Sequence, residues 1–357
     1  MLRRVARALH IPLAILVTED EEEADVQRRE FFRAGAIGAG AVAGVATAPS
    51  ALGTSGTPRI GASDIAALAD SVEQLHSLDL VLGGDRLRGL AAGQVRYARQ
   101  LLGAGSYSDA VGQELAGTTA ELMTAAGWVE YDSGHPGKAA RYYTEAAQTA
   151  TAADDGIAAA HALGNASHLM VNRLGSETSG DRLAVQYAQA ATRAAAKRGG
   201  PGLRALMALR EAEANGARGD RVEMARAVSR AFRAYDSSRG FDPGWVYLPQ
   251  AEMSGVSGKA HMRIGDHAAA VAHFRDAIAG SSAWPRERAS WQLHLTHNLI
   301  RSGDVAAACG QLTDTFATIT ELASARLQRR LADVIALVRP HSAVPEAREL
   351  LGLWVSR

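Results

Sequence analysis

Apolar and polar positions along most of the chain follow the three- and four-residue spacing of amphipathic helices. Short turn phrases separate these helical stretches, and each phrase has a glycine, a small polar residue and then an alanine-rich segment. They begin at Gly105, Gly134, Gly219, Gly265 and Gly303, with a weaker phrase at Gly180. No segment keeps the two-residue alternation of a half-buried strand. The pattern therefore predicts an all-α protein, in which a repeated helical hairpin stacks into an array.

Two of the hairpins share one spacing of small and aromatic residues. The residues are Gly127, Ala139, Tyr143 and Ala146 in one hairpin, and Gly258, Ala270, Phe274 and Ala277 in the other. Small residues let paired helices approach closely, and an aromatic ring four positions after an alanine fills the gap between pairs. The spacing resembles the tetratricopeptide repeat, although Leu312 replaces the aromatic in the last copy. The resemblance implies a superhelical array of antiparallel helix pairs, an α-solenoid, over residues 61–357.

Composition narrows the function classes. Lys plus Arg and Asp plus Glu both number 38, so no overall field directs the chain to nucleic acid or an anionic membrane. The single cysteine, Cys309, excludes an intramolecular disulfide and a thiolate zinc site, and we expect it in the core. No uncharged apolar run reaches the length of a membrane-spanning helix. No nucleophile, phosphate-binding or metal-ligand motif is present, so the sequence predicts no enzyme, no metal and no cofactor.

Residues 1–18 have an apolar helical face and a cationic one that carries Arg3, Arg4 and Arg7, and Pro12 ends the pattern. The stretch from Leu2 to Leu16 resembles the last helix and tail of the phage-repressor type of helix-turn-helix domain in actinobacterial transcriptional regulators. Met1 stands where such a domain would be ending and the recognition helix is absent, so we expect either a misassigned start codon or a truncated relative that has lost DNA binding. The three arginines are weak candidates for DNA contact, because three charges release few counterions. Direct DNA binding is expected only if a missing amino-terminal domain is restored.

Residues 19–60 are first acidic and then rich in Gly and Ala. We interpret them as a linker. Within them, Arg28 and Arg29 precede an aromatic pair and a weakly apolar run, which resembles a twin-arginine export signal. A cytoplasmic protein is the expectation, and export through this signal is the alternative.

In a stack of helix pairs, the first helix of each pair lines the concave side, where a ligand would bind. The clearest polar stripe on such a helix combines amides and imidazoles, which suit a peptide backbone or a carboxylate. It consists of His161, Asn165, His168 and Asn172. Other candidates are Glu121, Trp128 and Tyr131 on one helix, and His297 and Arg301 on another. An ordinary solvated face, a polar contact between helices, or core packing of the two aromatics are the structural alternatives.

The resemblance to repeat-containing regulators implies a signal-sensing protein whose array binds a peptide, a small signal or a partner protein. A homodimer is left open. The alternative function is a scaffold or adaptor for protein–protein interaction, either inside the cell or exported.

Overall fold

The computed structural model describes residues 59–172, 179–237, 241–246, 248–322 and 324–356. The predicted helix-turn-helix remnant with Arg3, Arg4 and Arg7, and nearly all of the predicted linker with its arginine pair, lie outside these residues.

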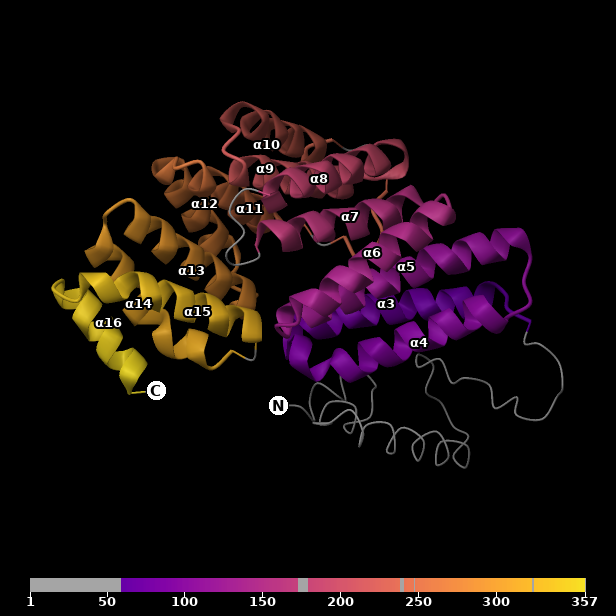
Figure 1. Cartoon of the computed structure of the whole chain (residues 1–357), viewed down its shortest axis with the longest axis horizontal. Helices are drawn as coiled ribbons and strands as arrows, with labels where there is room; N and C mark the ends of the chain where they lie inside the picture. The colour runs from indigo at the N-terminus through magenta and orange to yellow at the C-terminus, as the bar shows by residue number, and fades with distance from the viewer. Residues whose placement is uncertain (1–58, 173–178, 238–240, 247, 323, 357) are drawn as a thin grey trace.

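Within the described ranges the protein is all-α, as predicted, and the helices follow one another along the chain (Figure 1). The first half contains α3 (Ala62–Leu82), α4 (Arg88–Ala104), α5 (Asp109–Asp132), α6 (Pro136–Ala152), α7 (Gly156–Val171), α8 (Ser179–Arg198) and α9 (Pro201–Ala217). The second half contains α10 (Arg221–Tyr235), α11 (Gln250–Arg263), α12 (His267–Gly280), α13 (Pro285–Arg301), α14 (Val305–Thr320), α15 (Ala325–Val338) and α16 (Pro345–Val355). Two short 3₁₀ turns, Gly84–Arg86 and Arg339–His341, interrupt the series.

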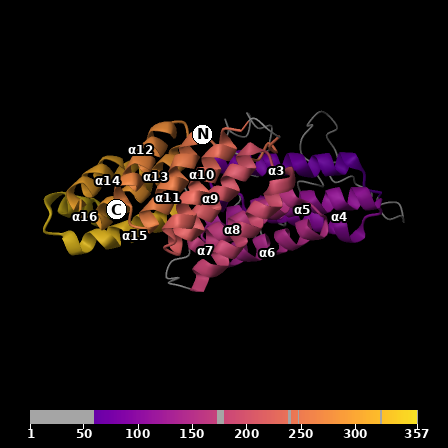
Figure 2. The ribbon, with the colours of Figure 1, turned by 90° about the horizontal axis from the view of Figure 1, so that it is seen from above.

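From α5 to α14 consecutive helices pack as pairs, and the odd-numbered helices contact one another in series from α3 through α15. The pairs form an arch with α7 to α10 at its top, and they succeed one another along the long axis of the molecule (Figures 1 and 2). The start of α15 also contacts α5, so the late part of the array meets the early part. This contact encloses the polar site described below.

The glycine phrases form the predicted turns at four places. Gly134, Gly219, Gly265 and Gly303 adopt positive φ angles between 77° and 90°, which cost a glycine little. After the last three, an aspartate caps the next helix by accepting from the backbone N–H three residues on. The turn before α7 has the same geometry without a glycine. Asp154 takes the position with positive φ, at 53°, and Asp155 caps the helix. Gly180 is different from the prediction, since it lies in the first turn of α8.

The predicted small and aromatic positions form the seams between helices. Tyr143 and Phe274 are fully buried, as are the four alanines of the same spacing. Gly127 faces the Tyr143 ring so closely that an added Cβ would lie 2.5 Å from Cε1, and Gly258 faces Phe274 in the same way. Cys309 is buried in α14, as expected. None of the described helices is both long and apolar enough to cross a bilayer.

Candidate ligand cavity at the centre of the array

Two adjoining cavities lie among the odd-numbered helices α5 to α15. An inner cavity of about 70 Å³ and an outer cavity of about 300 Å³ share four lining residues. The shared residues are Tyr131, Asn172, Arg326 and Arg330. The outer cavity is also lined by Arg329 and Asp333 from α15, and the inner cavity continues to α11 and α13.

Four of the nine residues nominated in the array line the inner cavity: Trp128, Tyr131, His168 and Asn172. They come from α5 and from α7 with the residue that follows it. The rings of Trp128 and Tyr131 lie 5.6 Å apart, and each lies within 6.0 Å of His168. The Arg326 guanidinium lies over Trp128, at 5.7 Å from the ring centroid. The structure therefore joins two separately predicted stripes into one wall.

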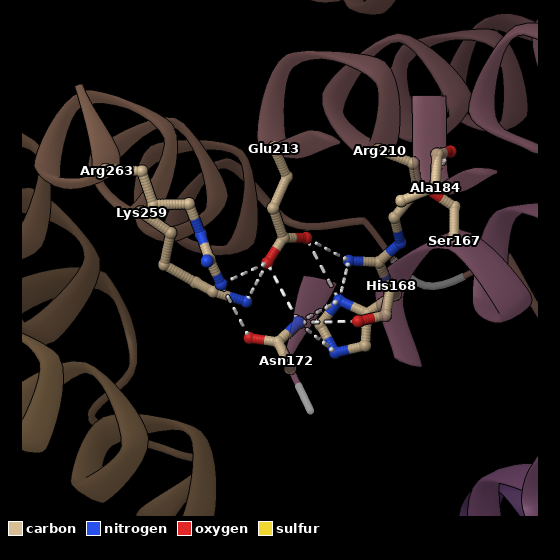
Figure 3. Close-up of polar contacts among 8 residues, drawn as sticks. All are labelled: Ser167, His168, Asn172, Ala184, Arg210, Glu213, Lys259 and Arg263. Atoms are coloured by element: carbon tan, nitrogen blue, oxygen red, sulfur yellow. Dashed lines mark hydrogen bonds and ion pairs between the residues drawn. The ribbon is translucent and has the colours of Figure 1, made fainter. Parts of the chain in front are cut away.

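The carboxylate of Glu213, on α9, organises the polar wall behind this cavity (Figure 3). It forms an ion pair with Lys259, lies 3.0 Å from His168 Nδ1 and accepts from Asn172 Nδ2 at 3.1 Å. Burial raises the pKa of Glu213, but Lys259, His168 and Arg210 outweigh burial and hold that pKa well below its ordinary value. Burial lowers the pKa of Lys259 to about 8.

His168 is neutral at pH 7, because burial first and then Arg210 lower its pKa to about 3. It is 8% exposed and Asn172 is half-buried. This part of the predicted stripe is therefore a polar contact between α7 and α9 as well as a cavity wall, which matches one of the alternatives considered from the sequence. Neighbouring helices cover it, so it is not an open groove face.

The other half of the stripe belongs to a separate cluster. His161 Nδ1 lies 2.6 Å from Glu121 Oε2, and the His161 ring stacks on Trp245 at 4.0 Å. Burial raises the pKa of Glu121. Asn165 lies between the two clusters and is 7% exposed. His161, Asn165 and Glu121 do not line either cavity.

His297 and Arg301 are also outside the two cavities. His297 is half-buried, and Arg301 is exposed at the end of α13. Burial, followed by Arg330 and Arg301, lowers the pKa of His297 to about 4. The structure does not bring this pair together with the aromatic wall.

A second buried network, centred on Asp132 at the end of α5, closes the site; we name it the closing network. Asp132 accepts from Arg286 Nη2 at 2.8 Å, Arg326 Nε at 3.0 Å, Ser324 Oγ at 2.9 Å and Gly84 N at 3.2 Å. Burial raises its pKa, but Arg326 and Arg286 outweigh burial and lower it. Arg286 also donates to the backbone carbonyl of Asp79. The network thus ties α3 and α5 to α13 and α15.

Several polar groups of the inner cavity lack partners among the residues that the structure describes. Trp291 Nε1, His294 Nδ1 and Glu287 Oε2 are buried atoms without a hydrogen bond. Arg330 and Glu252 line the same cavity, and neither side chain has a hydrogen bond or ion pair within the described ranges. Buried polar groups are normally hydrogen-bonded, so this concentration of unpartnered groups indicates a place where a ligand or water binds.

Sequence reasoning missed most of this charged lining. Arg326, Arg329 and Arg330 have the i, i+3, i+4 spacing of one helical face, and that spacing was the available signal. No comparable spacing along one helix marked Lys259, Glu252 and Glu287, because their neighbours in the cavity come from other helices.

No protein-family model matches this sequence, and no match to a curated protein was found. In the described part of the chain, no group of three side chains is arranged to hold a metal ion.

Proposed function

We propose that this protein is a signal-sensing regulator whose helical array binds a peptide, a small signal or a segment of a partner protein in the central cavity. The observation that carries the proposal is the set of unpartnered polar groups in a cavity that six helices build together. An outer cavity of about 300 Å³ is at the lower end of the size range of small-ligand sites. Aromatic rings beside positioned polar groups are typical of such sites.

The closing network supports a way to transmit occupancy. Arg326 lines both cavities and also binds Asp132, so a ligand that competes for this guanidinium would weaken the link between α5 and α15. In a regulator, such a change in the array would bias the output of an attached domain.

A matched pair of serine substitutions tests whether the cavity binds ligand. Ser290 lines the inner cavity, whereas Ser282 is exposed just before the same helix, α13. We expect Ser290→Leu to fill the cavity and abolish retention of tripeptides in equilibrium dialysis of the full chain against a tripeptide pool, with mass spectrometry as the readout. Ser282→Leu should retain the same peptides as the unaltered chain. Equal retention by both variants would refute a cavity site.

The proposal assigns the protein to the cytoplasm. The arginine pair Arg28–Arg29 favours a second candidate, an exported scaffold. An export reporter fused to residues 1–60 separates the two, because transport that is lost when both arginines become lysine would establish export.

A further inference from the structure

We infer that the ligand of the central cavity is a short peptide of two or three residues with both ends free, whose ammonium group lies at Glu252 and Glu287 and whose carboxylate lies at Arg330. This inference rests on the proposed function and adds the chemical class of the ligand. It follows from where the unpaired charges of the two cavities lie.

The outer cavity is lined by three arginines and one carboxylate, Asp333, so it has an excess of positive charge that an anion can balance. Arg330 lines both cavities without a hydrogen bond or ion pair among the described residues, and Arg329, one residue before it, lines the outer cavity. A guanidinium binds a carboxylate through two parallel hydrogen bonds, which makes it the preferred partner of that group. The Tyr131 ring lies at the junction of the two cavities and adds apolar surface beside Arg330.

The inner cavity contains two carboxylates besides four cationic side chains. Glu252 and Glu287 both line it, and Glu287 adds to burial in raising the pKa of Glu252. Three of the four cations that line this cavity are already engaged: Arg210 and Lys259 by Glu213, and Arg326 by Asp132. A ligand ammonium between the two carboxylates would relieve their repulsion and supply a donor to the buried Glu287 Oε2. Trp291, 5% exposed, supplies an aromatic surface there for a cation.

The arrangement selects for size as well as charge. The inner cavity, at about 70 Å³, has room for an ammonium group and little more, while the outer cavity, at about 300 Å³, has room for side chains. Arg330 borders both. A peptide of two or three residues would therefore present its ends to opposite charges while its side chains remain in the larger space.

End-blocked peptides test the inference. The tripeptide most strongly retained from the pool is prepared with free ends, with an acetylated amino end and with an amidated carboxyl end, and its affinity for the full chain is measured by calorimetry. We expect each block to weaken binding at least about tenfold, because each removes a charge-assisted interaction. Arg330→Gln should make amidation nearly without effect while acetylation still weakens binding. Glu287→Gln should reduce the effect of acetylation alone.

Controls on α16 use the same substitutions at exposed positions, Arg348→Gln and Glu349→Gln, and both should bind all three peptides as the unaltered chain does. Thermal unfolding of each variant checks that the fold is retained. If blocked and free peptides bind equally at a site that Ser290→Leu abolishes, the inference is wrong and the proposed function stands. If the chain retains no tripeptide from the pool, the peptide inference is wrong, whereas the proposed function, which also covers a small signal or a partner segment, does not fall with it.

Discussion

Replacement of Asp132 by asparagine is the sharpest test of how the array is closed. The Asp132 side chain is fully buried and is held by four donors, two of which are the guanidiniums of Arg286 and Arg326. Asn keeps the shape but removes the charge, so two buried or half-buried cations lose their common counter-charge. Breaking a buried pair from one side costs about 3–5 kcal/mol. We therefore expect Asp132→Asn to lower the free energy of unfolding by at least about 3 kcal/mol.

Urea unfolding followed by circular dichroism measures this loss. With a denaturant dependence of about 3 kcal/mol per molar urea, the midpoint should fall by about 1 M. The matched control is Glu145→Gln, which removes one partner of the exposed pair with Arg99. An exposed pair contributes only about 0–1 kcal/mol, so that midpoint should hardly move. Equal shifts in the two variants would refute the view that Asp132 holds α5 against α13 and α15.

Two further predictions concern the seams and the buried histidines. Gly127→Ala should destabilise the fold by about 1–3 kcal/mol in urea unfolding, because the new methyl group overlaps the Tyr143 ring. The control is Gly137→Ala at an exposed position where the new methyl group meets no other atom. This variant should be neutral or stabilising by up to about 1 kcal/mol. The pKa of His168 in the folded protein, about 3, lies below its ordinary value of about 6.5. As the pH falls below about 6.5, the unfolded chain therefore binds a proton at His168 while the folded protein does not, and the free energy of unfolding decreases. Between pH 7 and 4.5 the unaltered chain should lose about 2 kcal/mol more than His168→Gln. Asp79 has a raised pKa of about 6 and opposes this loss in both proteins, so the difference between them isolates the histidine. Parallel pH dependences would show that His168 does not titrate on unfolding.

The helical class and the seams were predictable because they depend on local information. Tyr143 and Phe274 lie against Gly127 and Gly258, and three or four residues of spacing are enough to indicate which face of a helix is buried. The glycine turns were predictable for the same reason, since a positive φ favours one residue type. The turn at Asp154 was missed because aspartate reaches that conformation less often, and its signal is correspondingly weak.

The site was only partly predictable, because its residues meet through contacts between distant helices. His161 and His168 share one helical face, yet Glu121 binds the first and Glu213 the second. Periodicity places both histidines on the inner side of the array. It does not indicate which charged side chain of another helix pair contacts each histidine. Whether such a stripe is an open surface or a buried contact therefore depends on the partner helices.

The same physics explains why the centre of the array is charged while its seams are apolar. Alanine and glycine seams bring helices close together with little side-chain volume, so the inner helices leave a small central space rather than a filled core. Long side chains such as Lys259 and Arg326 reach into that space and pair with Glu213 and Asp132. Each carboxylate binds more than one cation, and Arg330 is left without a side-chain hydrogen bond or ion pair within the described ranges. A cation without a counter-charge lowers the stability of the unliganded protein. A ligand of opposite charge restores that stability when it binds.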